Sequence, residues 1–372
     1  MHQNQQNVLV CPLDWGLGHA SRMIPVIHCF LARGYQVILG GSGKSAELLK
    51  VSFPELLLVP MPSPVIRYSE KGRWLIPSLI RQFPAMVLSV FREHRHIKTI
   101  VEKYKLNIVV SDNRYGLFCK QAYCIFVTHQ VSPVLPTLFR WAEYPLYLAI
   151  RKIIHQYNEC WIPDYSDPEK NLSGKLSHRF LLPRNAKYVG ILSRFKAMVV
   201  IQEPELSEKY ELVIILSGPE PQLSILHKLL MAWVITIQKK TLIITGLNQE
   251  YQILKFSDHW PLSIVSHLDP QHFRQVLLNA RIIICRSGYS GIMDLVALGK
   301  TALLVPTPGQ PEQEYLAEYL TQKGFFTYIR QDELDPDKLM KYMNEEFIPH
   351  ACPEMQGEDE IPDTPLSHKK HD

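Results

Sequence analysis

Long apolar runs are missing from this chain. No segment reaches the roughly 18 uninterrupted apolar residues that a membrane-spanning helix needs. The first residues, MHQNQQN, lack the basic and apolar segments of a secretory signal. The seven cysteines are scattered and none forms a CxxC pair, which argues against disulfides and against a zinc site. We therefore expect a cytoplasmic protein with reduced thiols.

Several common catalytic motifs are absent too. The sequence has no Walker motif, no HExxH and no GxSxG. The segment Asp335-Pro336-Asp337 resembles a metal-binding DxD. It begins a polar helical stretch, however, and this position favours helix capping. No motif therefore indicates a bound metal or cofactor.

The composition is that of an ordinary globular protein, with 46% apolar and 20% charged residues. Its charge is spread unevenly. Residues 1–198 hold 25 Lys/Arg and 12 Asp/Glu, whereas residues 199–372 hold 15 and 24. This asymmetry indicates two units with different partners, although drift in surface composition also explains it. The basic half suits an anionic surface or substrate, and we expect no nucleic-acid partner.

Short apolar runs alternate with helical segments along the chain. In the first half the apolar runs lie at residues 7–13, 35–41, 55–61, 107–112, 124–129 and 159–164. The helical segments lie at 20–34, 45–50 and 76–104, with an interruption expected at Pro84. After a polar connector at 203–211, apolar runs follow at 212–218, 241–246, 262–268, 280–285 and 302–306. This alternation predicts parallel sheets covered on both faces.

We therefore predict an α/β fold with two Rossmann-like, doubly wound domains that face a cleft. The first domain is predicted to span residues 1–198 and the second residues 199–348. The remaining residues, 349–372, are rich in proline and charge, so we expect a disordered tail.

Ligands bind beyond the carboxyl ends of the strands in open α/β sheets, so the turn after each strand is a candidate site. The run ARIIIC is followed by Arg286-Ser287-Gly288-Tyr289-Ser290-Gly291 and by a helix expected from Ile292 to Leu298. We expect Gly288 and Gly291 to take positive φ and to let the backbone approach a ligand. The helix amides near Ser290 lack internal partners and can bind an anion such as a diphosphate.

Asp294 is predicted to lie in the first turn of that helix. Its carboxylate can accept hydrogen bonds from a vicinal diol, such as two ribose hydroxyls. The alternative is that Asp294 only complements the helix dipole.

Two other turns of the second half are candidates. Ser217-Gly218 follows one apolar run and suits the other side of a diphosphate, although such a turn is common. Before a later helix, Gln310, Glu312 and Gln313 suit sugar hydroxyls, because their side chains accept and donate hydrogen bonds in pairs. An exposed loop with an acidic helix start is the alternative interpretation.

In the first half, the turn DWGLGHASR follows the first apolar run. Gly16 and Gly18 fit a tight turn, and His19 begins the helix, where it is either a general base or a structural residue. The turn partly matches a dinucleotide-binding motif, but the acid expected after the next strand is absent. Asp112 and His129 also end predicted strands, so both are expected at the same cleft edge.

The segment CRSGYSGIMDLVALGKTALLVPTPGQPEQEYLA resembles the donor-binding signature of GT-B nucleotide-sugar glycosyltransferases, family 28 type. The matching positions are Arg286-Ser287-Gly288, Asp294, Gly299, Pro306 and Gln313 to Ala317. Asp294 stands where the family usually has Glu, and Leu316 where it has Asn. GLGHASR is similar to the family's N-terminal glycine loop, and YVGILSR, at Gly190 and Arg194, to its domain junction. GLGHASR also resembles the GxGHxxR loop of a nucleotide-sugar hydrolase of the same fold.

The resemblance implies transfer of a sugar from a UDP-sugar co-substrate to an acceptor hydroxyl, with inversion and without a metal or another cofactor. By this match Arg194, Arg286 and the amides near Ser290 and Gly291 neutralise the departing UDP. His19 would deprotonate or orient the acceptor. A nucleotide-sugar hydrolase or epimerase of the same fold is the first alternative. A non-catalytic nucleotide-sugar binder or a different α/β protein is the second.

The first domain is expected to bind the acceptor, whose identity the sequence does not fix. Its helices WLIPSLI and AMVLSVF lie among five arginines, Arg67, Arg73, Arg81, Arg92 and Arg95. Such a surface suits the inner face of an anionic membrane and a lipid-linked acceptor. The alternative is that these helices face the core and that the arginines are solvated.

Overall fold

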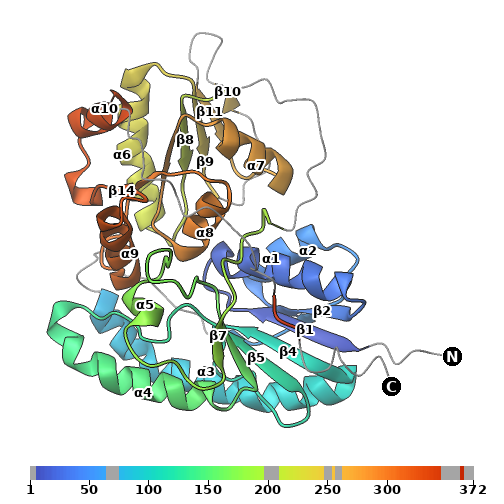
Figure 1. Cartoon of the computed structure of the whole chain (residues 1–372). Coiled ribbons are helices and arrows are strands. Elements are labelled where there is room, and N and C mark those ends of the chain that lie inside the picture. Colours follow the sequence, from blue (N-terminus) through green and yellow to red (C-terminus); the bar gives the residue numbers. More distant parts are fainter. Residues whose placement is uncertain are drawn as a thin grey trace.

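The computed structural model describes residues 6–63, 75–196, 209–246, 254–255, 262–344 and 361–363. Figure 1 shows two α/β units, one built from the blue to green part of the chain and one from the yellow to red part. Each unit contains a seven-stranded sheet with helices packed against it. The α/β class and the division into two such units are therefore confirmed.

The first sheet is wholly parallel and has the strand order β3-β2-β1-β4-β5-β6-β7. Its strands are β1 Asn7–Pro12, β2 Gln36–Gly41, β3 Leu58–Pro60, β4 Leu106–Asp112, β5 Tyr123–Val127, β6 Glu159–Ile162 and β7 Ala186–Tyr188. The helices are α1 Leu17–Ala32, α2 Gly43–Ser52, α3 Leu75–Tyr104, η2 Thr137–Ala142, α4 Glu143–Ile154 and α5 Lys175–His178. The interruption expected at Pro84 is wrong, because α3 continues through this proline.

The second sheet has the order β10-β11-β9-β8-β12-β13-β14, and only β10 runs antiparallel among its described pairs. Its strands are β8 Leu212–Ile215, β9 Thr241–Ile244, β10 Leu254–Lys255, β11 Leu262–Val265, β12 Ile282–Cys285, β13 Leu303–Leu304 and β14 Thr327–Tyr328. The helices are α6 Gln222–Ile237, α7 Pro270–Asn279, α8 Tyr289–Ala297, α9 Pro311–Gln322, η3 Gln331–Glu333 and α10 Pro336–Asn344. Asp335 caps α10 by accepting a bond from the Lys338 amide, as the capping interpretation predicts.

Burial on both faces explains the continuous apolar strands. In β1, Val8 and Val10 pack into one core cluster and Leu9 into the cluster on the other face, all with no exposed surface. The same holds around β12, where Ile283 and Ile284 belong to different clusters. Removal of this apolar surface from water stabilises both units.

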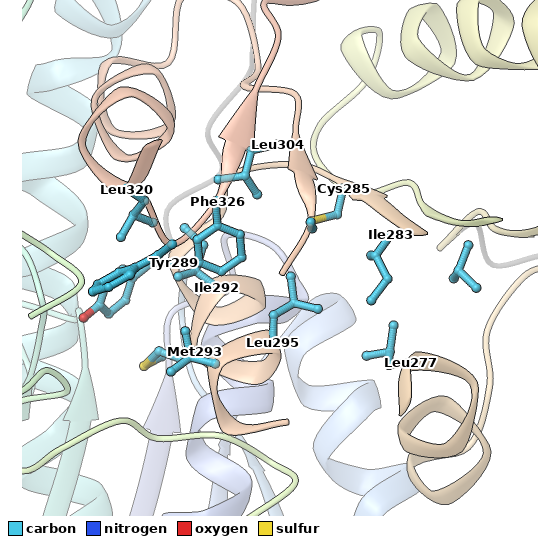
Figure 2. Close-up of a cluster of buried hydrophobic side chains, with 14 of the residues drawn as sticks. Leu277, Ile283, Cys285, Tyr289, Ile292, Met293, Leu295, Leu304, Leu320 and Phe326 are labelled. Atoms are coloured by element: carbon cyan, nitrogen blue, oxygen red, sulfur yellow. The ribbon is translucent and has the colours of Figure 1, made fainter. Parts of the chain in front are cut away.

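Helix α8 connects the core of the second unit to the first unit. Figure 2 shows Ile292, Met293 and Leu295 of α8 among side chains of the surrounding strands and helices. The opposite side of the α8 region contacts α1 of the first unit, and α8 lies between the second sheet and α1 in Figure 1. The α8 amino terminus is thereby placed where the two units meet.

The end of the chain returns to the first unit. Ile361 packs in the core cluster of the first sheet, and the Pro362 carbonyl accepts a hydrogen bond from Arg33 at 3.0 Å. Asp363 pairs with the same arginine at 3.1 Å. The rest of the stretch expected to be disordered, residues 349–360 and 364–372, lies outside the described residues.

No helix within the described residues is long and apolar enough to cross a membrane.

Candidate active site

The strand order places a topological switch point in each sheet. In the first sheet β1 lies between β2 and β4, and in the second β8 lies between β9 and β12. In open α/β sheets, ligands bind at such points, beyond the carboxyl ends of the strands. His19 follows β1 and Asp112 ends β4, whereas Ser217-Gly218 follows β8 and Gly288 follows β12. The predicted site turns therefore lie at the two switch points.

His19 and Asp112 form a pair at the first switch point. The His19 Nδ1 atom lies 2.9 Å from Asp112 Oδ2, and the His19 side chain keeps 15% of its surface exposed. Asp112 is fully buried and also accepts bonds from Nε of Arg22, 3.0 Å from each carboxylate oxygen. Arg22 lies three residues after His19 on α1, so both side chains share one helix face.

Charge neighbours keep Asp112 ionised. Burial by itself would raise the pKa of this carboxyl, but Arg22 and His19 outweigh burial and bring the pKa below its usual value. A buried arginine and a buried carboxylate compensate each other only when their hydrogen bonds are well made, as they are here. Asp112 is therefore a fixed, ionised hydrogen-bond acceptor for His19, and Arg22 balances its charge.

His129 joins this network from the loop after β5. Its Nδ1 atom lies 3.0 Å from Nη1 of Arg22, and its Nε2 atom lies 2.8 Å from Oε1 of Glu312, which belongs to the second unit. The His129 ring stacks on the ring of Tyr289 with centroids 4.1 Å apart. Burial lowers the pKa of His129, so the imidazole is neutral near pH 7.

The amino terminus of α8 is open at the second switch point. Gly288 is its N-cap, with no side chain bonded to the cap, and a Cβ atom added to Gly288 or Gly291 would meet nothing within 4 Å. The positive φ expected of both glycines is wrong, since Gly288 has φ −75° and Gly291 lies inside the helix. What these glycines supply is free space beside the first helix amides. Ser290 Oγ donates to the Gly18 carbonyl at 2.8 Å across the interface.

Asp294 lies deeper in α8 than predicted. The helix begins at Tyr289 instead of Ile292, because Gly288 is already its N-cap, and its first turn contains no acidic residue. Asp294 therefore falls in the second turn. Its carboxylate accepts bonds from Ser193 Oγ at 2.7 Å and from Nε of Arg194 at 2.8 Å. Asp294 and Arg194 therefore form an ion pair with each other.

Arg286 is hydrogen-bonded to the backbone. Its guanidinium donates to the backbone carbonyls of Val305, Pro306 and Gln222, at 3.1, 3.1 and 2.8 Å. Burial lowers the pKa of this arginine to about 10. The expectation that Arg286 faces a phosphate does not agree with this geometry, because backbone carbonyls after β13 and at the start of α6 already accept from both of its terminal nitrogens.

The remaining predicted donor-side residues shape the loops. Ser287 donates to the Gln313 carbonyl, Gln313 Oε1 accepts from the Thr307 amide, and Gln313 Nε2 donates to Gln310 Oε1. Ser217 and Gly218 are exposed, and Gly218 has φ 113°. Glu312 faces His129 as described above. In the first unit, Gly16 caps α1 with φ 91°.

Some participating residues were not predicted from the sequence. Arg22 lies inside the quoted GLGHASR, and its spacing of three from His19 was the available signal. Ser193 precedes the predicted Arg194, and Tyr289 lies inside the predicted loop. None of the three was assigned a role, since only the tertiary fold brings their partners together.

Comparison with solved structures identifies the fold. The glycotransferase of kitacinnamycin superposes with a TM-score of 0.61 at 14% identity, over 92% of this chain and 90% of that chain. MurG of Acinetobacter baumannii superposes with a TM-score of 0.52 at 11% identity, over 92% of each chain. The two units together therefore form the GT-B fold of glycosyltransferases.

Sequence comparison then points to one family. Residues 199–359 match the glycosyltransferase family 28 C-terminal domain. One relative is the UDP-N-acetylglucosamine--N-acetylmuramyl-(pentapeptide) pyrophosphoryl-undecaprenol N-acetylglucosamine transferase of Pasteurella multocida (strain Pm70), 33% identical over 91 residues, or 24% of this chain and 25% of the relative. The enzyme of that name from Caldicellulosiruptor saccharolyticus is 33% identical over 84 residues, 22% of this chain and 23% of the relative. The chain spans about a quarter of such relatives' length. Its second unit resembles the family 28 C-terminal domain, within a chain of GT-B fold.

Proposed function

We propose that this protein is a glycosyltransferase that moves a sugar from a UDP-sugar to an acceptor hydroxyl. The observation that carries the proposal is the position of the His19–Asp112 pair, at the turn whose Gly18 carbonyl is hydrogen-bonded to Ser290 of α8. A basic side chain thus lies beside an open helix amino terminus. The family 28 match of the second unit and the transferases among its relatives support the same activity.

The hydrogen bonds of His19 suit a general base. An ionised carboxylate can only accept a hydrogen bond, so we infer that the His19 Nδ1–H donates to Asp112. The lone pair of the ring then lies on Nε2, which no described residue engages in a hydrogen bond. Nε2 can take the proton of an acceptor hydroxyl while the oxygen attacks the anomeric carbon. A single displacement of this kind inverts the anomeric configuration.

The donor diphosphate is assigned to the space beside Gly288 and Gly291. Unpaired helix amides and the helix dipole stabilise negative charge at this position. They can therefore accept the charge that develops on the leaving UDP without a metal ion. Asp294 would exchange its bonds to Ser193 and Arg194 for the ribose hydroxyls, and Arg194 would then be free to face a phosphate.

For the acceptor we propose a lipid-linked hydroxyl reached from the inner face of an anionic membrane. On α3, Leu88 is 57% exposed and Phe91 is 62% exposed beside the exposed Arg92. A second exposed apolar set lies along η2 and α4: Leu138, Trp141, Tyr144 and Leu148. We assign the membrane contact to these two sets, because exposed apolar side chains that share a helix suit burial at an interface. Arg67 and Arg73 lie outside the described residues, and the side chain of Arg81 is not described.

Vesicle co-sedimentation tests the membrane proposal. The protein should sediment with anionic vesicles at low salt, and Leu138→Ser with Trp141→Ser should reduce the bound fraction several-fold, since interfacial binding scales with buried apolar area. An exposed control, Val51→Ser, changes an apolar residue of α2, away from η2 and α4. Absence of sedimentation at low salt would remove the membrane from the proposal without affecting the donor site.

Thermal shift with UDP and UDP-sugars tests the activity, followed by transfer assays with the hits. A ligand that binds only the native protein at 100 times its Kd should add about 2.7 kcal/mol of stability. Sugar release that requires an acceptor hydroxyl would support transfer. Release into water alone would instead identify a hydrolase, and the lack of any shift with uridine nucleotides would contradict the proposal.

A further inference from the structure

We infer that Glu312 is a positioning residue for His19, although it belongs to the other unit. The inference rests on the proposed function for its catalytic consequence, but its structural part can be tested alone. Three residues of the first unit link the two side chains: His129, Arg22 and Asp112. Among the described residues, these form one unbroken set of hydrogen bonds from α9 to the start of α1.

The first link fixes the tautomer of His129. The Arg22 guanidinium can only donate, so the His129 Nδ1 atom, 3.0 Å from Nη1 of Arg22, must accept. Nε2 therefore carries the proton and donates it to Glu312 Oε1 at 2.8 Å. Both assignments agree with a neutral, buried imidazole whose pKa is lowered by burial.

Glu312 itself is held in place. Its other carboxylate oxygen, Oε2, accepts a hydrogen bond from Gln130, the residue after His129. The pKa of Glu312 lies below its usual value: burial would raise it, but the neighbouring His129 and Arg22 favour the ionised form. The stacked ring of Tyr289, anchored by its bond to the Pro163 carbonyl at 2.8 Å, fixes the plane of His129. The second unit therefore sets both the position and the orientation of His129.

The second link transmits this position to the base. Arg22 donates to His129 from Nη1 and to Asp112 from Nε. Its Nη2 atom also lies 2.9 Å from His19 Nδ1, but this contact is not a hydrogen bond, because that nitrogen carries the proton donated to Asp112. A guanidinium is planar and rigid, so a shift of Nη1 rotates all its donors together. Asp112 and Arg22 have no more than 1% of their surface exposed, and neither can move alone. A displaced His129 would therefore tilt the His19–Asp112 pair.

This arrangement couples alignment of His19 to contact between the units. The Glu312–His129 bond exists only while α9 lies against the loop after β5. His19 would be correctly aligned when the proposed diphosphate site at the α8 amino terminus lies beside it. It would be misaligned when the units separate. Misplacement of a reacting group by about 1 Å can cost roughly 100-fold in rate.

Steady-state kinetics of three variants test the coupling. Glu312→Leu should lower kcat roughly 10- to 100-fold and leave the KM for the UDP-sugar within about threefold. Glu312→Gln retains an acceptor for the His129 proton and should restore kcat to within about threefold of wild type. The matched control is Tyr319→Phe on the same helix, which removes an interface bond to Asn171 of 2.6 Å and should change kcat little. UDP-induced thermal shifts report whether each variant is folded.

Two kinetic outcomes would overturn the inference. A raised KM with unchanged kcat in Glu312→Leu would make Glu312 a sugar ligand. Equal losses in Glu312→Leu and Tyr319→Phe would reduce its role to joining the units.

Nitrogen NMR of histidine-labelled protein gives a readout independent of turnover. Wild-type His129, assigned by comparison with His129→Gln, should show an unprotonated Nδ1, and the His19 resonances should shift in Glu312→Leu but not in Tyr319→Phe. Unchanged His19 resonances in Glu312→Leu would overturn the inference. If the shifts occur but no UDP-sugar is turned over, the network stands and the proposed function fails.

Discussion

The turn before α1 and the turn before α8 are built alike but differ in what they hold. Each follows a strand at a switch point, each has glycine at the N-cap, and each is supported by an Asp–Arg ion pair. Behind α1, Asp112 and Arg22 are buried. At α8, Arg194 keeps 23% of its side chain exposed in its pair with Asp294.

This difference separates two tasks. A buried pair cannot be exchanged for solvent or ligand without a large cost, so Asp112 and Arg22 keep a fixed geometry for His19. A partly exposed pair costs less to open, because water can solvate the separated charges. Asp294 and Arg194 therefore suit a site whose partners change when a ligand binds. Under the proposed function, the first turn therefore suits proton transfer and the second suits ligand binding.

The largest effect is expected from the first turn. His19→Ala should reduce turnover by roughly 10²- to 10⁴-fold, because the general base is removed, and should leave UDP affinity nearly intact. Single-turnover kinetics and UDP titration measure the two separately. His155→Ala, an exposed histidine after α4, is the control. Loss of UDP binding in His19→Ala would assign this residue to the donor and would break the comparison.

At the second turn, Gly291→Ala should have the opposite pattern. Alanine meets no atom there and should stabilise α8 by about 0.5–1 kcal/mol, while its methyl group occupies the diphosphate space and weakens UDP binding roughly tenfold. Urea unfolding and UDP titration measure both effects.

The control for that variant is Gly299→Ala. Gly299 has φ 63°, so alanine there should destabilise the protein without changing the proposed diphosphate site. Unchanged UDP affinity in Gly291→Ala would place the diphosphate elsewhere.

A smaller effect should show in discrimination between UDP and 2′-deoxy-UDP. If Asp294 accepts a bond from the ribose, wild type should prefer UDP about tenfold, since a hydrogen bond to a charged group contributes about 1.5–3 kcal/mol. Asp294→Asn should reduce this preference to about threefold. Calorimetric titration of both nucleotides gives the ratio, which cancels any general loss of affinity. An unchanged ratio in Asp294→Asn would remove Asp294 from the ribose.

The smallest effect concerns stability and pH. The pKa of His129 is below its ordinary value of about 6.5, so the unfolded chain takes up this proton first as the pH falls. Stability contributed by the neutral ring is present above about pH 6.5 and declines below it. Wild type should therefore lose more unfolding free energy between pH 7.5 and 5.5 than His129→Gln does. Urea unfolding at both pH values measures this difference, and equal losses would contradict it.

Periodicity predicted most of the fold, because buried parallel strands require continuous apolar runs. The runs at 7–13 and 280–285 contain β1 and β12, and the helical segment at 20–34 corresponds to α1. The short edge strands β10 and β14 were not predicted, because two residues are too few to show a periodic pattern of apolar side chains. The sequence predicted an interruption at Pro84, but α3 continues through it. The free-energy cost of one proline is outweighed by the rest of a 30-residue helix.

The site was predictable in outline only. Glycines and the residues after strands locate a turn, so the positions of His19, Asp112 and Gly288 at the strand ends were predicted. Side-chain direction is set by tertiary partners, and Arg286 therefore points to three carbonyls that no motif reveals. The α8 start was placed three residues late, because the glycine-rich segment concealed that Tyr289 is already helical.

Residues 361–363 follow the second unit in the sequence, yet they are anchored beside Arg33 in the first unit. The second unit is therefore joined to the first at both of its ends, and a large rotation of one unit against the other would have to break the contacts of Arg33. Removal of residues 361–372 should leave the second unit joined to the first at one end only.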